Sequence, residues 1–214
     1  KSSPWDWEIR VVDDGSADAT ADIVLSVARE EPRIRLQREP HRGKGGAGTA
    51  GLVAAGASHR FLCDADLSMP IAEISRFMPP FLGDAQLAIG SREGTGARRV
   101  GEPWLRHVAG RGFNTIVGLM MLPDIHDTQC GFKMFTAAAV DTIFPRVTVE
   151  GWAFDIEVLY IARLHRLRIL EVPIEWHYRA DSRLRMGRDG IGMLRELTQI
   201  KRRAKRGAYG VSAV

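Results

Sequence analysis

The sequence is poor in cysteine and lacks long apolar runs, and each absence excludes a class of protein. Cys63 and Cys130 are the only cysteines in 214 residues, too few for a disulfide framework, so a reducing cytosol is expected. No run of about 18 apolar residues is present, so no transmembrane helix is predicted, and no signal peptide is apparent. The histidines lack the spacing of metal ligands, which argues against a zinc site of the His-Glu-x-x-His type.

What the chain does contain is the composition of an ordinary globular domain. Hydrophobic residues make up 45% and charged residues 26% of it, and no repeat, low-complexity tract or linker interrupts the pattern. A chain of 214 residues is long enough for one substantial core. We therefore expect residues 1–214 to form a single domain.

Positive charge is concentrated near the C-terminus, more strongly than the net charge of +4 suggests. Two acids, Asp189 and Glu196, oppose a basic run made of Arg183, Arg185, Arg188, Arg195, Lys201, Arg202, Arg203, Lys205 and Arg206. Such a run is typical of a protein with an anionic partner, although a solvated helix face has the same pattern. The candidate partners are nucleic acid, an anionic membrane surface and a phosphorylated substrate. Nucleic acid is disfavoured, because few aromatic residues accompany the basic ones and stacking platforms are lacking.

Short strands alternate with helices through the first half of the chain. The predicted strands cover residues 8–12, 34–37, 60–63 and 87–91, and the predicted helices cover residues 19–30, 43–58 and 71–81. This order predicts an α/β fold with a mostly parallel sheet flanked by helices.

The second half is less regular. Residues 93–101 hold three glycines and two arginines without an apolar period, which predicts a mobile loop. Helices are predicted over residues 104–121, 155–166 and 189–206, with a strand at 168–172 that residues 174–177 either extend or pair with. The last helix is basic and amphipathic, with an apolar side made of Ile191, Leu194, Leu197 and Ile200.

Two carboxylates, Asp64 and Asp66, follow the predicted strand at residues 60–63. Residues two apart in an extended chain face the same way, and the carboxyl ends of strands in α/β sheets open into ligand-binding crevices. Two hard oxygen ligands at that point suit a divalent cation that also holds phosphate groups. Because Asp-x-Asp is common by chance, its meaning depends on the neighbouring motifs.

The segment Asp13-Asp14-Gly15-Ser16 also connects a predicted strand to a predicted helix. A carboxylate at that point can accept hydrogen bonds from a nucleotide base or from ribose hydroxyls, and Gly15 permits the tight turn. The alternative is a helix cap without a ligand, with Ser16 or Asp18 at the N-cap.

A glycine-rich segment at residues 43–51 matches the dinucleotide-binding fingerprint twice. That fingerprint needs a strand directly before it, whereas Pro40 and its neighbours intervene here. A P-loop is excluded as well, because neither Ser nor Thr follows Lys44. What remains is a basic glycine-rich loop suited to a diphosphate, with Lys44 as a point charge.

Two further motifs place polar groups in apolar surroundings. Residues 127–133 read Asp-Thr-Gln-Cys-Gly-Phe-Lys, for which a buried cap with a free cysteine is the alternative to a functional site. Residues 151–157 read Gly-Trp-Ala-Phe-Asp-Ile-Glu, where Asp155 is a helix-cap candidate. Glu157 lies further into a mostly apolar helix and is therefore harder to explain as a surface residue.

Taken in order, these motifs resemble glycosyltransferase family 2, and most closely its dolichyl-phosphate β-glucosyltransferase-like branch. The resemblance rests on residues 11–16, 42–45, 64–68, 90–92, 127–133, 151–157 and 171–176. It extends over residues 8–206, and the segment at 127–133 is the most specific to the branch. It implies a GT-A fold, which is Rossmann-like, and an inverting transfer of a sugar from a nucleotide sugar to a polyprenyl phosphate.

The resemblance also implies roles for individual residues. The nucleotide-sugar-binding candidates are Asp13, Asp14, Lys44 and Asp64. The metal-binding candidates, for Mg²⁺ or Mn²⁺ with the diphosphate, are Asp66 and Asp64. The acceptor-phosphate candidates are Arg92 and Arg106. The catalytic candidates are Asp66, Asp127, Gln129 and Arg92, of which Asp127 and Gln129 would face the sugar near the reacting carbon.

The chain departs from the family pattern in two places. The family's opening strand is absent, so the domain is expected to lack the first strand and helix, and Ser68 stands where some prenyl-phosphate mannosyltransferases have glutamine. An acceptor phosphate is ionised near neutral pH and needs no strong base. Positioning and charge stabilisation are therefore expected to carry most of the rate.

The implied acceptor is a membrane lipid. The basic helix at residues 188–206 is therefore expected to lie on an anionic membrane surface, with the protein peripherally attached at the cytoplasmic face. Glucose from UDP-glucose is the favoured donor. Transfer of mannose from GDP-mannose, or nucleotide-sugar binding without turnover, are the alternatives that the sequence leaves open.

Overall fold

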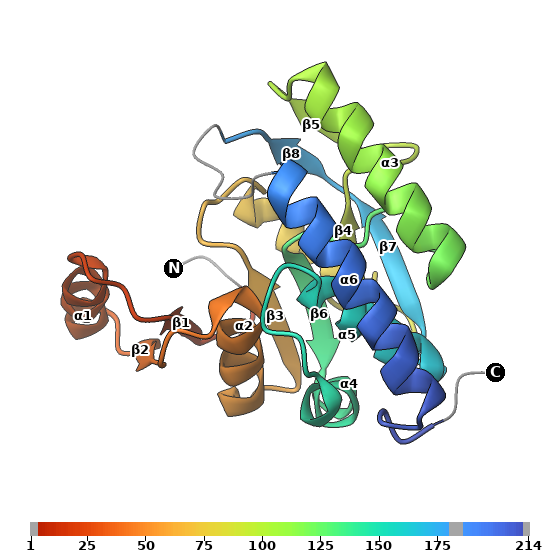
Figure 1. Cartoon of the computed structure of the whole chain (residues 1–214). Helices are drawn as coiled ribbons and strands as arrows, with labels where there is room; N and C mark the ends of the chain where they lie inside the picture. Colours follow the sequence, from red (N-terminus) through yellow and green to blue (C-terminus); the bar gives the residue numbers. More distant parts are fainter. Residues whose placement is uncertain (1–3, 180–185, 212–214) are drawn as a thin grey trace.

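The computed structural model, which describes residues 4–179 and 186–211, arranges its strands in one larger sheet and two small ones (Figure 1). The larger sheet has the order β3 (His59–Cys63), β6 (Phe132–Thr136), β4 (Leu87–Ser91) and β7 (Ile169–Pro173). The small sheets pair β1 (Ile9–Asp13) with β2 (Ile34–Arg38), and β5 (Arg98–Val100) with β8 (Glu175–His177). The expected α/β architecture is therefore present.

The larger sheet is mixed, which corrects the prediction of a mostly parallel sheet. β1 and β2, β4 and β7, and β5 and β8 pair in parallel, whereas β6 runs antiparallel to both β3 and β4. The sequence pattern does not reveal β6, because Lys133 interrupts its apolar run. Cys63 lies opposite Phe132, so the segment that follows β3 lies beside the segment that precedes β6.

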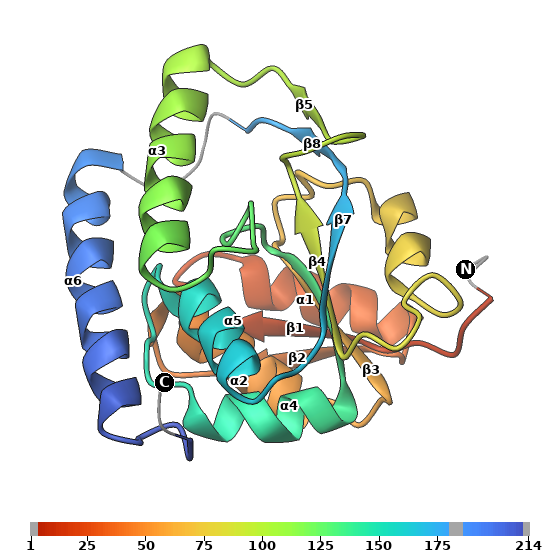
Figure 2. The same cartoon turned by 90° about the vertical axis from the view of Figure 1, so that its right-hand side faces the viewer.

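Helices cover the sheets and carry much of the core. They are α1 (Thr20–Glu30), α2 (Gly43–Ala54), α3 (Trp104–Met120), α4 (Ala137–Ile143), α5 (Phe154–Leu164) and α6 (Met186–Lys205), with 3-10 helices η1 (Ile71–Phe77) and η2 (Phe144–Arg146). Figure 2 shows α5 between α6 and the larger sheet. Within the described residues, no helix combines the length and the apolar character that crossing a bilayer requires.

Two predicted segments differ from the observed ones. The helix predicted over residues 71–81 is a 3-10 helix that ends at Phe77, shortly before Pro79 and Pro80, which cannot donate helical hydrogen bonds. The loop predicted over residues 93–101 contains β5, which pairs with β8. Residues 174–177 accordingly pair with that strand and do not extend β7.

The predicted N-caps of the first helix are also wrong. Ala19 is the N-cap of α1, and its side chain accepts no hydrogen bond there. Asp18 instead accepts a hydrogen bond from the backbone N–H of Thr20 at 3.0 Å. The N–H of Ser16 donates to Asp13 at 2.8 Å, so both polar residues stabilise the turn that precedes the helix.

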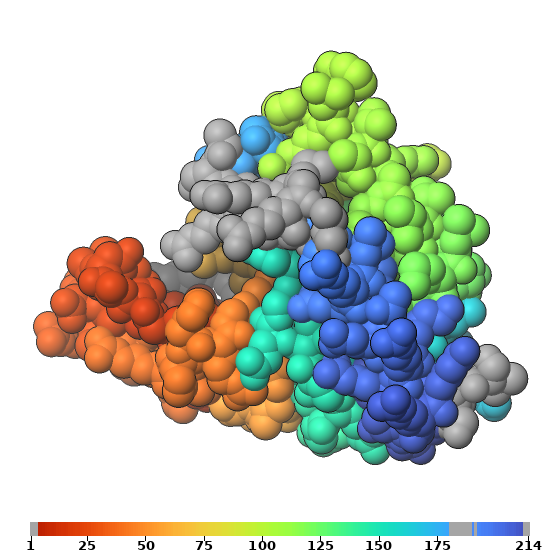
Figure 3. Space-filling view, in the orientation of Figure 1, coloured from red at the N-terminus to blue at the C-terminus, as the bar shows by residue number. Residues whose placement is uncertain are grey.

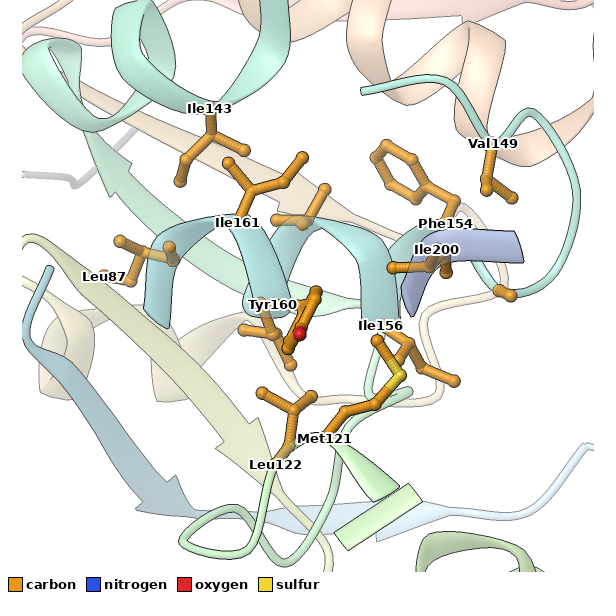
Figure 4. Packing of buried hydrophobic residues seen from close by; sticks show 14 of the residues in the cluster. Leu87, Met121, Leu122, Ile143, Val149, Phe154, Ile156, Tyr160, Ile161 and Ile200 are labelled. Carbon is orange, nitrogen blue, oxygen red and sulfur yellow. The ribbon is translucent and has the colours of Figure 1, made fainter. Parts of the chain in front are cut away.

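The main hydrophobic cluster is centred on α5, where every residue from Phe154 to Ala162 is buried (Figure 4). A helix apolar on all sides must lie inside the protein, and here the sheet covers one side and α6 another. Leu197 and Ile200 of α6 are fully buried in this cluster, as predicted, whereas Leu194 of the predicted apolar side is exposed. The side chain of Ile191 lies outside what the structure describes.

Glu157 is a buried acid within this core, and its environment explains how it is accommodated. Its carboxylate accepts hydrogen bonds from the backbone N–H groups of Thr148 and Val149 at 2.8 and 2.7 Å. The hydroxyls of Thr148 and Tyr209 donate to it at 2.6 Å each. Glu157 therefore fastens the loop before α5 to the segment after α6, which is a structural role.

We expect Glu157→Gln to lower the free energy of unfolding by about 2 kcal/mol, because a neutral amide accepts these four bonds less well than a carboxylate. Urea unfolding measures the change. The matched control is Glu30→Gln, since Glu30 is an exposed acid on α1 and its replacement should change the same quantity by less than about 0.5 kcal/mol. Equal effects of the two substitutions would contradict the assigned role of Glu157.

Candidate active site

A cavity of about 700 Å³ lies where β3 and β4 end. Its charged lining includes Lys44, Asp64, Asp66, Arg92, Arg99 and Arg106. Its apolar lining includes Met69, Phe113, Ile116, Trp152, Trp176 and Leu194. The cavity thus combines acids at one strand end, arginines at the next, and an apolar wall from α3 and α6, as expected of a crevice at the carboxyl ends of sheet strands.

A chain of alternating charges runs from the cavity into the core. The Nζ atom of Lys44 lies 3.3 Å from a carboxylate oxygen of Asp64 and 3.1 Å from one of Asp155. The other oxygen of Asp155 lies 2.8 Å from the Nζ atom of Lys133. Asp155 and Lys133 have side chains only 2% and 1% exposed, so each buried charge is compensated by its neighbours.

The neighbouring carboxylates keep Lys44 cationic. Burial alone lowers the pKa of Lys44, but Asp155 and Asp64 outweigh it and raise the pKa above its ordinary value. Burial raises the pKa of Asp64, and Lys44 partly offsets that rise. Burial likewise opposes ionisation of Asp155, yet Lys133 and then Lys44 hold its pKa below the ordinary value. Asp155 is therefore the buried anion that holds both lysines in place.

Gly131 makes room for Asp64. A Cβ atom added at Gly131 would lie 1.8 Å from the Oδ2 atom of Asp64, a separation that no side chain tolerates. The backbone N–H of Asp64 also donates to the carbonyl of Gly131 at 3.0 Å. The glycine of the Cys-Gly-Phe-Lys segment is thus required for the position of a carboxylate that follows a different strand.

Asp66 occupies an exposed turn at the edge of the cavity. Its Oδ1 atom accepts a hydrogen bond from the N–H of Ser68 at 2.9 Å, and Leu67 between them has a positive φ of 51°. That conformation is uncommon for a branched residue and stores strain at this turn. Among the residues that the structure describes, no cationic side chain forms an ion pair with Asp66, in contrast to Asp64.

The residues present fit a divalent cation that a ligand helps to hold. In the described part of the chain, no three His, Cys, Asp or Glu side chains are grouped closely enough to bind a metal by themselves. Asp64 and Asp66 nevertheless supply two carboxylates to one cavity. Mg²⁺ and similar ions are commonly held by one or two carboxylates together with substrate phosphates and water, and the donor set agrees with that arrangement.

Arg92 and Asp127 form a bidentate ion pair in which the carboxylate is fully buried and the arginine is partly exposed. The Nε and Nη2 atoms of Arg92 donate to the two carboxylate oxygens of Asp127 at 2.7 and 2.8 Å, and the Arg92 backbone N–H adds a third bond at 2.9 Å. Asp127 is fully buried and does not line the cavity, whereas Arg92 does. Asp127 thus lies behind the arginine and does not line the cavity, whereas the resemblance implies that it would face the sugar.

Titration of this pair reflects its burial. Burial by itself raises the pKa of Asp127, but the Arg92 guanidinium outweighs it and lowers the pKa from 3.8 to about 2. The same pairing raises the pKa of Arg92 against the effect of burial. Both groups therefore stay charged at neutral pH.

Arg99 lies on the same side of the cavity as Arg92. Arg99 donates to Glu93 and to Glu102, at 2.6 Å in each case. The Arg92 and Arg99 guanidinium carbons lie 5.4 and 5.9 Å from the ring centre of Trp176. The segment predicted to be a mobile loop is therefore tied down by ion pairs, which its lack of apolar periodicity does not reveal.

The remaining predicted residues divide between the cavity and its surroundings. Arg106 lines the cavity, with its guanidinium carbon 5.2 Å from the ring centre of Tyr178. Gln129 also lines it and donates to the carbonyl of Trp152 at 3.3 Å. The predicted nucleotide ligands Asp13 and Asp14 lie outside the set of lining residues.

Asp14 has a structural task next to the cavity. Its carboxylate oxygens accept hydrogen bonds from the backbone N–H groups of Arg42 and Gly43 at 2.7 and 2.8 Å. These N–H groups begin α2, so Asp14 caps that helix from a distant part of the chain. The cap fixes Lys44 one residue further along, which connects the acidic turn after β1 to the charge chain.

Sequence reasoning missed Lys133 and Asp155 as members of the site. Lys133 lies in the motif at residues 127–133 but has no predicted role, and Asp155 is predicted only as a helix cap. A lysine inside the apolar run Phe-Lys-Met-Phe is the available signal, because a buried lysine requires an anionic partner. The partner itself, in a helix more than twenty residues away, follows only from the fold.

The chain is similar to a known family and to named relatives. Residues 3–144 match the family described as Glycosyl transferase family 2. The chain is 36% identical over 201 residues to the dolichyl-phosphate beta-glucosyltransferase of Trichomonas vaginalis, covering 91% of this chain and 59% of that protein. It is 32% identical to the Saccharomyces cerevisiae enzyme of that name, covering 95% and 66%, and 30% identical to the human one, also covering 95% and 66%. The chain thus spans less than two thirds of the length of these relatives.

Solved structures share the fold. The glucosyl-3-phosphoglycerate synthase of Mycobacterium tuberculosis in complex with UDP aligns with a TM-score of 0.61 at 19% identity, covering 95% of this chain and 69% of that one. The same enzyme with Mn²⁺, UDP-glucose and phosphoglyceric acid aligns with a TM-score of 0.60 at 17% identity, again covering 95% and 69%. At these identities the likeness concerns the α/β fold alone.

We expect Arg92→Met to lower the free energy of unfolding by about 3–5 kcal/mol near neutral pH, because it leaves the Asp127 charge buried and unpaired. In the variant the guanidinium no longer opposes burial, and the Arg92 backbone N–H and Lys133 offset burial only in part. The pKa of Asp127 therefore rises, and the acid is neutralised as the pH falls. In the wild type, the lowered pKa of Asp127 stabilises the fold fully at pH values above its unfolded pKa of 3.8. This stability is lost only as the pH falls towards about 2. The difference in free energy of unfolding between the wild type and the variant, the stability gap, should therefore become smaller as the pH falls.

Urea unfolding at a series of pH values from about 7 to about 4 measures this gap. The control is Arg92→Met combined with Asp127→Asn, which removes the buried charge and should show a gap that does not depend on pH through this site. A gap of constant size in the single variant would refute the assignment of the pair.

Proposed function

Because the chain belongs to glycosyltransferase family 2, we propose that it transfers glucose from UDP-glucose to a dolichyl or other polyprenyl phosphate, with inversion at the anomeric carbon. The observation that supports this most is the cavity in which Asp64 and Asp66 lie at one strand end and Arg92 and Arg106 at the other side. The first pair suits a diphosphate-bound cation and the second pair suits a phosphate acceptor. The names of the relatives supply the sugar and the lipid.

The donor half of the site is proposed to form around Asp66, Asp64 and Lys44. Asp66 and Asp64 would hold Mg²⁺ or Mn²⁺ together with the diphosphate. A bound cation supplies positive charge to the leaving diphosphate. Lys44, kept cationic and fixed by Asp155, presents its ammonium group to the same cavity. A charge held in place before the reaction needs no reorganisation when the leaving group becomes more negative.

Asp13 and Asp14 are proposed to approach the base or ribose of the donor. Asp13 is the last residue of β1 and Asp14 follows it, and Asp14 contacts the start of α2, which also carries Lys44. The nucleoside would therefore lie on the β1 side of Lys44, outside the cavity described above. The Asp14 carboxylate would have to share its oxygens between the N–H groups of α2 and the ligand.

The acceptor half is proposed to form around Arg92 and Arg106. Arg92 offers the remaining nitrogen of its guanidinium, because Asp127 occupies the other two. Asp127 then acts as a positioning residue that aims Arg92. Gln129, on the cavity wall, is placed to contact the sugar or the acceptor.

The proposed reaction balances without a proton acceptor. An oxygen of the acceptor phosphate, already ionised, attacks the anomeric carbon on the face opposite the diphosphate. The bond from that carbon to the diphosphate oxygen breaks, and UDP leaves with the electron pair. Because both reactants are anionic, the arginines and Lys44 lower the repulsion between them, which is the main contribution expected from the protein.

The apolar wall of the cavity is consistent with a lipid acceptor. Phe113 and Ile116 of α3 and Met193 and Leu194 of α6 all line it. A soluble sugar acceptor would gain little from such a wall, whereas a prenyl chain would bury it. We propose that the protein works at the cytoplasmic face of a membrane, with peripheral attachment.

We expect Asp66→Asn to lower the rate of glucose transfer by on the order of 100-fold or more, because the carboxylate that holds the cation is lost. The assay measures transfer from radiolabelled UDP-glucose to a polyprenyl phosphate with Mn²⁺ or with EDTA. The matched control is Asp22→Asn, an exposed acid on α1 that should leave the rate unchanged.

GDP-mannose, tested in parallel, gives the donor preference. Metal-dependent stabilisation by UDP-glucose in a thermal melt, with no transfer by the wild type, would indicate a binding module and reject the transferase proposal. A rate in Asp66→Asn equal to that of the wild type would reject Asp66 as the metal-binding residue.

A further inference from the structure

The helix predicted to lie on a membrane, α6, has much of its apolar side buried in the core. The apolar side of α6, including Met193, Leu197 and Ile200, is buried against α5 and does not face outward. What α6 exposes includes the basic residues Arg195 and Arg202. Among the described side chains of α6, Leu194 is the exposed large apolar one, so this helix offers a membrane mainly charge.

α3 has the opposite character. Val117 is its only fully buried hydrophobic residue, and its outward side carries Trp104, Leu105, Val108, Ile116 and Leu119, exposed by 70, 64, 59, 40 and 85%. Solvent-exposed helices normally bury their large apolar residues and show charged ones. Exposed large apolar side chains near both ends of one helix therefore mark an interaction surface.

The charge of α3 indicates the kind of partner. The helix contains no Asp or Glu, and Arg106, His107 and Arg111 are its charged or titratable residues. Figures 1 and 2 show α3 beside α6 on the same outer side of the molecule, and Figure 3 shows their surfaces adjoining. An apolar strip next to a basic one matches the boundary of an anionic bilayer, with acyl chains beneath phosphate headgroups.

The position of the cavity gives a second, independent argument. Phe113 and Ile116 of α3 and Leu194 of α6 line the cavity, and Ile116 is also exposed. The outward apolar side of α3 is thus continuous with the apolar wall of the proposed acceptor site. A bilayer in contact with α3 would place that wall against lipid.

We propose that α3 is the membrane-docking helix of this protein, with Trp104, Leu105, Val108 and Leu119 inserted at the headgroup–acyl boundary of an anionic bilayer. Arg195 and Arg202 of α6 contact the headgroups and contribute attraction that salt weakens. The purpose of this docking rests on the proposed lipid acceptor. The docking itself is a separate property, which vesicles without any substrate can test.

The test measures binding of the whole chain to vesicles of phosphatidylcholine with phosphatidylserine by co-sedimentation. The variant Val108→Glu with Leu119→Glu changes two exposed residues that do not line the cavity. Its binding should weaken by about ten-fold or more, because two apolar anchors are replaced by charges that anionic headgroups repel. Its melting temperature should stay unchanged, since neither side chain packs in the core.

The matched control is Ile23→Glu with Val27→Glu on α1, which makes the same chemical change at residues 62 and 45% exposed. Figure 1 shows α1 at the far side of the molecule from α3, so vesicle binding should not change. Arg195→Glu should weaken binding by about five-fold at low salt and by less at high salt.

Several outcomes would overturn the proposal. Wild-type binding by the α3 variant, or equal losses in the α3 and α1 variants, would reject α3 as the docking helix. A wild-type dimer that the α3 variant converts to a monomer, with vesicle binding unaffected, would assign the surface to a second copy of the chain.

Transfer to a short-chain polyprenyl phosphate dispersed in detergent separates this inference from the proposed function. The α3 variant should keep that activity while losing vesicle binding. Vesicle binding by a wild type that transfers no sugar would reject the function and leave the docking helix in place.

Discussion

The site depends on the buried carboxylate of Asp155. An anion in the core needs compensation, and Lys133 and Lys44 provide it at 2.8 and 3.1 Å. Because Lys133 comes from β6, Lys44 from α2 and Asp155 from the start of α5, the charge chain joins three elements that no local interaction connects. The position of Asp155 in the first turn of its helix further favours the negative charge. Removing it would leave two cations without their shared partner.

This constraint reaches the cavity through Lys44. The lysine contacts Asp64 on its other side, so the carboxylate that follows β3 is oriented by a residue whose own position is fixed from the core. Asp66, two residues on, has no such partner within the described residues and stays available. Two acids with identical chemistry thus differ in their surroundings: one is committed to a lysine and one is open to a ligand. The same division appears on the arginine side, where Asp127 occupies two nitrogens of Arg92.

Much of the fold follows from the sequence because strands and helices of the first half have clear periods. β4 matches its predicted bounds, and β1 to β3 differ by a residue or two at their ends. The sequence does not predict β5 and β6, because each contains a charged residue that forms an ion pair. Lys133 faces Asp155, and Arg99 faces Glu93, so neither strand alternates as a half-buried strand should. The cavity residues after β3 and β4 are likewise readable from position, whereas the burial of Asp127 depends on a partner brought in by tertiary contacts.

The α3–α6 pair shows why amphipathicity alone is a poor guide to a membrane surface. α6 has the stronger sequence pattern, yet most of its described apolar side packs in the core around α5, and its exposed residues are mainly charged ones, with Leu194. α3 has a weaker pattern because apolar residues lie on its outward side as well as towards the cavity. A helix with apolar residues on both sides is unfavourable in water unless a second apolar phase covers the outward one. A lipid acceptor would bring that phase to the cavity, so the feature that looks costly in the isolated domain becomes favourable where the substrate resides.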